Sequence, residues 1–546
     1  MYEVLFALTL IFVVAAVLLV VAARTSLSVI PFYLLAGVLA GVFIDEAQLL
    51  DLAQWGIAFL VFLFGIRFDV ESLRATGRIS VGVALLQAGV VGGLGVAAGL
   101  AFGFDPVNAV YLGVAAALSS SLVAVSYLDD ARGPRPTYAR IAESVHFTED
   151  ILGVLVVVAL GAFVYVEAPG LAQFAIAAGL LALALAIRYL LFHRLTGRLE
   201  GDDEVMMLIG VSFVVGFIAL AEYAGLSVVV GAFAAGIAVA DDYPLSLELV
   251  DTVDDLEDFF TPIFFVTVGA LVTVPGLQTL GYTLLLVGAV AVINPLVVAF
   301  VLLRGGFDGR TAVRTGLTLD QMSVFTLFIA IEALAAGTIY RPLFDAIVLA
   351  AVVTLFVAAY TGRHAQAINR WVREFGLITL LGEPLTDRSQ VADDLSQHVI
   401  VVDFERGSRR ILDTCAELDR PVLVIEDDPT MYETLRDECD NYVFGDVLDD
   451  RVWDLARLEE AALVVSLTPE YDRAAGVVDL DGDVPRVVRV DDEATARKFL
   501  DRDATGVLYP YAVSGERLAA DLGALLSGEL SEEEFAERGR AQFGAD

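Results

Sequence analysis

Long apolar runs separated by short charged loops dominate the first 360 residues. A membrane-crossing helix needs about 20 predominantly apolar residues, and thirteen runs approach or exceed that length. The mean hydropathy of +0.73 agrees with most apolar side chains facing lipid. The first run is too long to be a cleaved signal peptide, and it lacks the basic segment with which such a peptide begins. The expected fold class is therefore an α-helical polytopic membrane protein, with runs at approximately 2–23, 28–44, 52–68, 79–103, 107–128, 147–166, 171–192, 204–223, 225–240, 257–273, 277–303, 312–336 and 342–360.

The arginines between these runs fall in alternate loops, which predicts the orientation. The loops of one side hold a single arginine, Arg341. Cytoplasmic loops are enriched in Arg and Lys, so the richer side is expected to be cytoplasmic. With thirteen crossings, the N-terminus would lie outside the cell membrane and the C-terminal part in the cytoplasm. The arginine-rich loops hold Arg24, Arg67, Arg74, Arg78, Arg132, Arg135, Arg140, Arg188, Arg194, Arg198, Arg304, Arg310 and Arg314.

The chain is strongly acidic, with 71 Asp and Glu against 34 Lys and Arg and a net charge of −37. Residues 361–546 alone carry 41 acidic and 20 basic residues. Such a field repels phosphate, which excludes a nucleic-acid partner. The one lysine is Lys498, and an acid-rich, lysine-poor surface suits concentrated salt, where screening is strong. We therefore predict a halophilic host, to be tested by measuring stability against salt concentration.

The membrane part repeats itself in inverted orientation. The segment LLAGVLAGV (34–42) is echoed by VVGAFAAGI (229–237), and each precedes an acidic loop. After the loops come FLFGIRFDV (62–70) and IFFVTVGAL (263–271). The offset is about 200 residues, and one copy begins with an inward run where the other begins with an outward run. Inverted repeats are typical of secondary transporters, although chance similarity between small-residue helices is the alternative.

Polar residues interrupt two apolar runs that correspond in the repeats, 111–125 and 314–328. Hydroxyl and amide groups within a spanning helix compete for backbone partners and favour local unwinding. We therefore expect two broken helices that cross near the midplane and offer carbonyl oxygens and helix ends to an ion. The alternative is that the serines are small residues for close helix packing. The polar residues are Ser119, Ser120 and Ser121 in the first copy, and Asp320, Gln321 and Ser323 in the second.

A carboxylate at membrane depth costs at least about 2.5 kcal/mol, so such groups are functional by default. The best candidate is Asp150 in HFTEDILGV, with Glu149 beside it. A proton and a monovalent cation compete for the same buried oxygens, so Asp150 is predicted to exchange one for the other. Glu149 points about 100° away and would tune the site or carry a second proton. The alternative is that both residues cap their helix at the membrane interface.

Weaker candidates follow from the same search. Asn294 lies within an apolar run before Pro295, where a polar side chain often satisfies a freed carbonyl. Asp320 is a candidate hydrogen-bond acceptor that supports the ion ligands, and His146 is expected to be a hydrogen-bonded packing residue. Glu332 and Asp345 lie near an outer loop and are expected to be solvated.

Taken together and in order, these motifs resemble the monovalent cation:proton antiporters of the Kef-like (antiporter-2) type. The resemblance runs from about Tyr2 to Tyr360. It implies a dimeric thirteen-helix fold in which a core slides against a scaffold. It further implies that Asp150 is the shared proton and cation carboxylate, with the serine break beside it. The segments that carry it are YLLAGVLAG, FLFGIRFD, ALSSSLVAV, TEDILGV, LAEYAGLSVVVGAFAAGIAVADD, DFFTPIFFVTVGA and GLTLDQMSVF.

Two positions depart from the family pattern. Asn294 stands where many relatives have a basic residue opposite the aspartate. Val324 stands where relatives often have glutamate, after Gln321. The missing basic residue removes a proton carrier or salt-bridge partner for Asp150. Stoichiometry and the choice between Na⁺ and K⁺ therefore stay open.

The C-terminal part alternates strand and helix patterns from His398 to about Tyr511, which predicts a doubly wound parallel sheet. It resembles the TrkA-N (RCK, NAD-binding-like) regulatory domains of potassium transport proteins. Asp403, Glu405 and Ser408 occupy the places of the three phosphate-loop glycines. The side chains and negative charges of Asp403 and Glu405 oppose a pyrophosphate. We predict a Rossmann-like regulatory or dimerisation module without NAD or another cofactor.

The sequence thus predicts a secondary active transporter, not an enzyme, that exchanges Na⁺ or K⁺ for protons by alternating access. Its expected parts are a membrane domain (1–362), a linker (363–397), a Rossmann-like domain (398–513) and an acidic C-terminal helix (514–546). Expected partners are the cation, protons, lipid and a second copy of the chain. The alternative is a membrane-embedded sensor with vestigial transport that signals through the C-terminal domain. An ion channel is a third possibility, which the inverted repeat disfavours.

Overall fold

The protein is described here by a computed structural model that divides into two compact units. The first unit comprises Met1–Tyr127, Ile141–Val301 and Ala312–Leu377, and the second comprises Leu128–Arg140, Leu302–Thr311 and Ile378–Asp546. Two predicted site residues, Ser121 and Glu405, lie outside the residues that the structure describes. The described residues are 2–25, 28–41, 46–66, 78–120, 136–164, 171–192, 203–239, 259–374, 388–404, 406–468, 470–502 and 504–541.

Within its described ranges, the membrane part consists of helices joined by short non-helical segments, as the apolar runs predict. The helices are α1 (Tyr2–Thr25), α2 (Ile30–Ala40), α3 (Glu46–Ile66), α5 (Arg78–Ala101), α6 (Pro106–Ala117), α8 (Thr137–Val164), α9 (Leu171–Ile187) with the π-helix η2 (Arg188–Phe192), α11 (Asp203–Tyr223), α12 (Val228–Val239), the helix Phe259–Ala270, α14 (Leu277–Gly288), the π-helix η3 (Ala289–Ile293), α15 (Asn294–Arg304), α16 (Gly309–Leu317), α17 (Val324–Ala335), α18 (Arg341–Arg363) and α19 (Ala365–Glu374).

The helices differ in length, and the difference matters for the site. Within the described ranges, four helices are long and apolar enough to cross a membrane: Ile79–Ala101, Gln173–Leu190, Leu277–Arg304 and Arg341–Arg363. By contrast, α6 and α17 have only 12 residues each, which at 1.5 Å per residue is about 18 Å, roughly half a crossing. The expected number of thirteen crossings stays a prediction.

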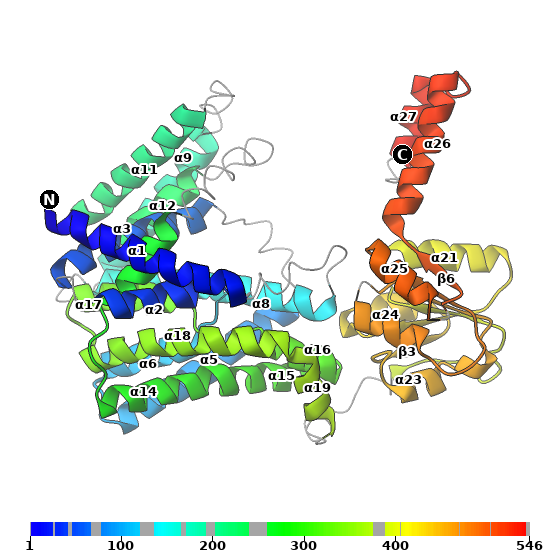
Figure 1. The fold of residues 1–546 in the computed structure, drawn as a ribbon, viewed down its shortest axis with the longest axis horizontal. Coiled ribbons are helices and arrows are strands. Elements are labelled where there is room, and N and C mark those ends of the chain that lie inside the picture. Colours follow the sequence, from blue (N-terminus) through cyan, green and yellow to red (C-terminus); the bar gives the residue numbers. More distant parts are fainter. Residues whose placement is uncertain are drawn as a thin grey trace. The chain divides into compact units, whose positions relative to one another are not determined.

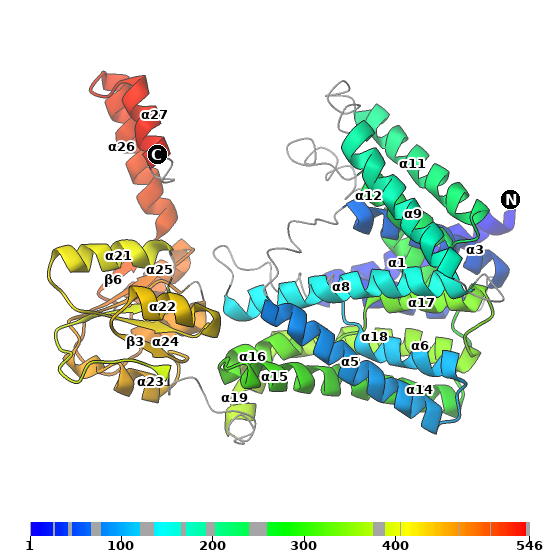
Figure 2. The ribbon, with the colours of Figure 1, turned by 180° about the vertical axis from the view of Figure 1, so that it is seen from behind.

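Three of these helices, α5, α14 and α18, lie around the half-length α6. In both views α5, α6, α14 and α18 run alongside one another (Figures 1 and 2). Helix α14 continues through η3 into α15, and Pro295 stands directly after the π-helical turn. A proline removes an N–H donor and collides with the preceding turn, which accounts for the local change of helix type.

The repeats pack against each other reciprocally. A side chain at Gly37 or Gly41 of α2 would meet the backbone of Val266 or Ala270 at about 2 Å, in the helix of the second copy. Conversely, a side chain at Gly236 of α12 would meet the Phe62 carbonyl of α3 at 2.3 Å. Each small-residue segment therefore lies backbone to backbone against the apolar segment that follows its counterpart. This packing follows the pseudo-symmetry of an inverted repeat.

The C-terminal part is a six-stranded parallel sheet in the order β3-β2-β1-β4-β5-β6, the doubly wound order that the alternating pattern predicts. In register, Val399 pairs with Val422 and with Leu463. The elements are β1 (Val399–Val402), α21 (Arg406–Glu417), β2 (Val422–Glu426), η5 (Pro429–Met431), α22 (Tyr432–Glu438), β3 (Tyr442–Phe444), α23 (Asp450–Leu455), η6 (Leu458–Glu460), β4 (Leu463–Ser466), α24 (Tyr471–Val478), β5 (Arg486–Arg489), α25 (Glu493–Leu500), β6 (Gly506–Leu508), α26 (Pro510–Ser527) and α27 (Glu532–Ala541).

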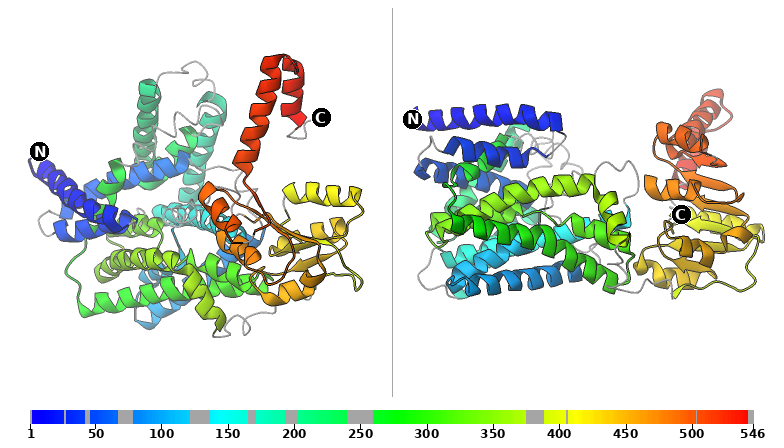
Figure 3. Two further views of the ribbon diagram at one scale, coloured as in Figure 1. Left: turned by 45° about the vertical axis from the view of Figure 1, so that its right-hand side comes forward. Right: turned by 60° about the horizontal axis from the view of Figure 1, so that its bottom comes forward.

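Both faces of this sheet are covered, because alternate strand residues point to opposite sides. On β1, Val399 and Val401 pack with Cys415 of α21. Ile400 and Val402 pack with residues of the other helical layer, including Phe499 of α25. After the last strand, α26 and α27 fold back on each other as a hairpin (Figure 3). Gly528 makes this reversal with a φ of +78°, in the left-handed region that glycine tolerates.

Candidate functional site

The two interrupted runs form breaks that cross each other. Helix α6 ends at Ala117 and α17 begins at Val324. Between them the chains pair as a short antiparallel bridge, Ser119 with Met322, and the Ser323 N–H donates to the Leu118 carbonyl at 3.1 Å. Gln321 Nε2 donates to the Ser120 carbonyl at 2.8 Å. The expectation of two broken, crossing helices is therefore confirmed.

The carboxylate of Glu149 lies directly against the first break. Its Oε2 accepts the Ser119 backbone N–H at 3.1 Å and also the Ser119 hydroxyl. The residue is only 1% exposed, and its second oxygen, Oε1, is buried with no hydrogen-bond partner in the described part of the chain. Because α8 begins at Thr137, Glu149 lies more than three turns inside the helix. The alternative that Glu149 and Asp150 cap a helix end is therefore wrong.

Asp150 is also buried, at 6% exposure, on the same helix. Its direction differs by about 100° from that of Glu149, as for any adjacent pair on a helix. The hydrogen bonds from Ser119 described above are accepted by Glu149. His146, one turn earlier, places Nδ1 3.2 Å from the Ser119 hydroxyl, which agrees with a hydrogen-bonded packing residue.

Two amides cap the end of α6 next to the break. Asn294 Nδ2 donates to the Ala116 carbonyl at 3.2 Å, and Gln87 Nε2 donates to the Ala117 carbonyl at 2.9 Å. Gln87 Nε2 also lies 2.7 Å from Asn294 Oδ1. These carbonyls carry the negative end of the helix dipole and have no partner within the helix. Neutral donors therefore satisfy the carbonyls at the end of α6. Asn294 donates to a carbonyl of another helix and not, as the sequence indicated, to one freed by Pro295.

Gln87 was missed by the sequence interpretation. It is the one amide side chain in the apolar run 79–103, and that isolation in lipid is the signal that could have found it. It is 0% exposed.

The second break holds three further predicted residues. Ser323 is the N-cap of α17, and its hydroxyl accepts the Phe325 N–H at 3.1 Å. Gln321 links the two breaks, as described above. Asp320 has a different partner from Glu149. Its Oδ2 accepts a hydrogen bond from the Thr361 hydroxyl of α18.

The expectation that Glu332 and Asp345 are solvated is wrong. Asp345 is 2% exposed and accepts from the Thr273 backbone N–H and hydroxyl, with Arg341 at 3.4 Å. Glu332 is 6% exposed. Nearness to a loop in sequence did not produce exposure, because α18 and α17 pack these positions inward.

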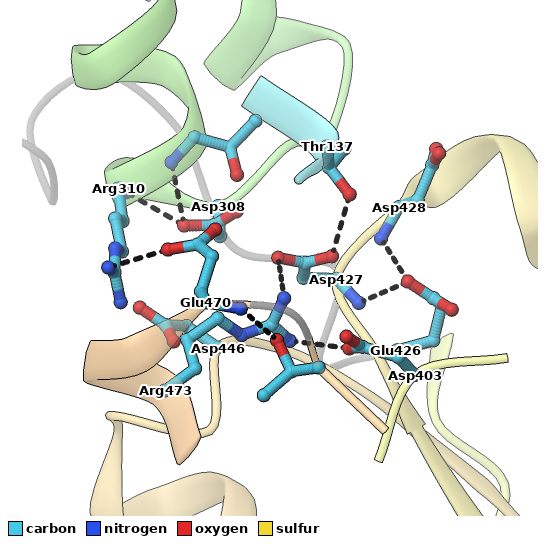
Figure 4. A network of polar contacts seen from close by, with 12 residues as sticks. Thr137, Asp308, Arg310, Asp403, Glu426, Asp427, Asp428, Asp446, Glu470 and Arg473 are labelled. Carbon is cyan, nitrogen blue, oxygen red and sulfur yellow. Dashed lines mark hydrogen bonds and ion pairs between the residues drawn. The ribbon is translucent and has the colours of Figure 1, made fainter. Parts of the chain in front are cut away.

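In the C-terminal sheet, the place of the phosphate loop is filled by an internal ion pair (Figure 4). Arg473 of α24 lies 2.8 Å from Asp403 and 3.0 Å from Asp427, and all three residues are buried. Asp403 has a φ of +69°, so it occupies a glycine-like conformation while carrying a charged side chain. The Ser408 hydroxyl donates to the Asp403 carbonyl at 2.6 Å.

Glu426 closes the same place from the end of β2. Its carboxylate accepts the backbone N–H groups of Phe404 at 2.8 Å, Asp427 at 2.9 Å and Asp428 at 3.0 Å. Burial, together with Asp403 and Asp427, raises the pKa of Glu426, and the N–H donors oppose that rise. The carboxylates Asp403, Glu426 and Asp427 lie close enough for a metal ion, but the guanidinium already supplies the positive charge. These residues do not fit a pyrophosphate, which needs bare backbone N–H groups.

The membrane site has the chemical features of a cation site. It brings together a buried carboxylate, a serine hydroxyl and the backbone carbonyls at the end of α6, and such oxygens are the ligands that hard cations prefer. A proton would bind the same carboxylate oxygens.

Both parts of the chain match known protein families. Residues 9–364 match the family described as sodium/hydrogen exchanger, transmembrane. Residues 399–510 match the TrkA-N domain.

Several curated proteins are similar over most of the chain. The putative K⁺ efflux antiporter KefB of Alkalimonas amylolytica is 26% identical over 91% of this chain and 77% of its own. The putative cation/proton antiporter YbaL of Escherichia coli is 25% identical over 85% of this chain and 87% of its own. The glutathione-regulated potassium-efflux protein KefC of Salmonella typhimurium is 26% identical over 79% and 70%.

A solved structure supports the fold of the membrane part. The sodium proton antiporter MjNhaP1 of Methanocaldococcus jannaschii covers 67% of this chain and 96% of its own, at 13% identity and a TM-score of 0.50. The crossing helices, the parallel sheet and these matches agree. The chain therefore belongs to the transmembrane sodium/hydrogen exchanger family, in its Kef-like branch, with a C-terminal TrkA-N domain.

Proposed function

We propose that this protein exchanges a monovalent cation, Na⁺ or K⁺, for protons across the cell membrane by alternating access. The observation that carries the proposal is the buried Glu149 carboxylate, which receives the Ser119 N–H and hydroxyl where the two broken helices cross. In this proposal Asp150 binds the proton and the cation in turn, and Glu149 tunes the site or carries a second proton. Crossed half-helices suit alternation, since small movements of their ends open the site to either side.

The remaining expectations belong to the same proposal. The chain acts as a homodimer with its N-terminus outside. Ser119, Ser120 and Ser121 bind the ion together with the two carboxylates, and the supporting residues are Asp320, Gln321, Ser323 and Asn294. The TrkA-N domain acts as a cytoplasmic regulatory or dimerisation module that needs no NAD. The internal Arg473 ion pair supports this role, because it satisfies the carboxylates of the loop within the domain. The protein has no enzymatic activity in this proposal.

The test is exchange by purified protein in liposomes with an imposed pH gradient, to which Na⁺, K⁺ or Li⁺ is added in turn. Wild type dissipates the gradient with at least one cation, Asp150→Asn abolishes the exchange, and Glu149→Gln reduces it at least about tenfold. Glu222→Gln, which neutralises an exposed carboxylate of α11, is the matched control and exchanges like wild type. Equal rates for wild type and Asp150→Asn would overturn the proposal.

A further inference from the structure

Asp320 is a buried carboxylate in the second break, between α16 and α17. It is 0% exposed. Its Oδ2 accepts the Thr361 hydroxyl of α18, while Oδ1 is buried and has no hydrogen-bond partner in the described ranges. Only one of its two oxygens is therefore satisfied by the protein.

The depth of Asp320 follows from its contacts along α18. Two residues further on, the Met322 N–H donates to the Thr354 hydroxyl at 3.2 Å, and Met322 pairs with Ser119 at the crossing. Thr361 lies seven residues beyond Thr354, which is about 10 Å along a helix. Helix α18 ends at Arg363, two residues after Thr361. The backbone of Asp320 is therefore at most about 7 Å from the crossing, and its carboxyl contacts the end of α18 that precedes the C-terminal part of the chain.

The surroundings leave this carboxyl without a countercharge. Burial, the Thr361 hydroxyl and its own backbone act on it, and no charged group among the described residues does. The adjoining elements carry Arg314 on α16, and Arg363 and His364 at the end of α18, and none of these groups acts on it. An ionised carboxylate that keeps one buried oxygen unpartnered is costly, so the group requires a proton or a cation.

We propose that Asp320 is a second proton- and cation-binding carboxylate, which loads or discharges ions on the cytoplasmic side of the crossing. This rests on the proposed antiport and adds a binding position to it. When a monovalent cation enters, the O–H bond of Asp320 breaks, the proton leaves to water, and the cation binds Oδ1 while Thr361 keeps its hydrogen bond to Oδ2. The competing explanation is structural: the Asp320 carboxylate would only stabilise the positive N-terminal end of α17 and would bind no cation.

Transport in liposomes separates these roles. In Asp320→Asn the amide oxygen still accepts the Thr361 hydroxyl, so the break keeps its hydrogen bond. The proposal predicts that the half-saturating cation concentration rises at least about tenfold. A folded variant with unchanged half-saturation and pH profile overturns it.

Thr361 offers a second variant with a matched control. Thr361→Val removes the hydrogen bond that stabilises the charged form of Asp320, so the pH of half-maximal exchange moves upward. Thr361→Ser keeps a hydroxyl and leaves the profile in place. A merely structural role moves neither profile, even if stability falls, and equal profiles for the valine and serine variants contradict the proposal.

An infrared measurement on purified protein is independent of transport. Adding the cation to wild type removes a protonated-carboxyl band, and the part due to Asp320 is missing from the difference spectrum of Asp320→Asn. If wild type shows no exchange but this band is present, the antiport proposal fails and the Asp320 site stands. If the difference spectra of wild type and Asp320→Asn are identical, the Asp320 site fails whether or not exchange occurs.

Discussion

The membrane crossing and the C-terminal sheet both bury carboxylates, but they neutralise them differently. At the crossing, Glu149 meets the Ser119 N–H and hydroxyl, and the one charged group that acts on it among the described residues is another acid, Asp150. In the sheet, Asp403 and Asp427 share the guanidinium of Arg473. The first arrangement leaves the negative charge for an ion from outside, and the second uses it within the protein.

The group that neutralises a buried carboxylate decides whether that carboxylate can still bind an ion. Dipoles and hydroxyls stabilise a buried carboxylate without cancelling its charge, so a cation or proton still gains free energy by binding. A buried arginine cancels the charge and fixes the geometry, so binding of a further ion would require breaking an existing ion pair.

The largest effect is expected from Arg473→Met. Removing the guanidinium leaves Asp403 and Asp427 buried without a countercharge, which costs about 3–5 kcal/mol. Amide hydrogen exchange of Val399–Val402 in the full-length protein should become at least about a hundredfold faster. Arg409→Met, which breaks the exposed pair with Glu438, should change little. Similar protection of these amides in wild type and Arg473→Met would show that the ion pair does not hold the loop.

A smaller effect is expected from Gln87→Leu at the other region. The variant leaves the Ala117 carbonyl at the end of α6 without its donor and removes a partner of Asn294, which costs about 1–3 kcal/mol. Thermal unfolding of the purified protein in detergent measures the loss. Gln278→Leu, on an exposed position of α14, is the matched control. If both variants melt together with wild type, neutral capping is not what stabilises the crossing.

The smallest effect is a pH dependence due to Glu426. Burial and the adjacent Asp403 and Asp427 raise its pKa in the folded state. The stabilisation from such a carboxyl is present below the unfolded pKa and is lost as pH rises through the folded pKa. Glu426→Gln removes this loss, so its melting temperature relative to wild type should rise between pH 5 and pH 9, by less than about 5 °C. A difference that is constant with pH would show that Glu426 stays ionised in the fold.

The elements that the sequence predicted well depend on local patterns. The polar residues Ser119 and Ser323 mark the breaks because they interrupt apolar runs, and Glu149 stands out because a carboxylate in such a run is costly. The parallel sheet follows from alternating strands and helices. Repeats could be recognised because small residues such as Gly41 and Gly236 recur at an offset of about 200 residues, and these glycines permit the backbone contacts seen in the fold.

The partners of these residues could not be predicted, because they come from distant segments. Gln87 and Asn294 are 207 residues apart, and Arg473 lies 70 residues from Asp403. The sequence indicated only that Asp320 is a supporting acceptor, because its contact with Thr361 of α18 depends on how the helices pack. Asp345 looked solvated because its burial depends on Thr273, which precedes it by 72 residues. Such contacts arise from helix packing, which a local pattern does not specify.

Competition between a cation and a proton at the crossing is measured as cation-dependent proton release. Purified wild type in weakly buffered detergent solution is expected to release protons when Na⁺ or K⁺ is added at constant ionic strength, because cation and proton compete for the carboxylates at the crossing. The double variant Glu149→Gln/Asp150→Asn should lose most of this release. Equal release by wild type and the double variant, or no release from wild type with any monovalent cation, would contradict the account.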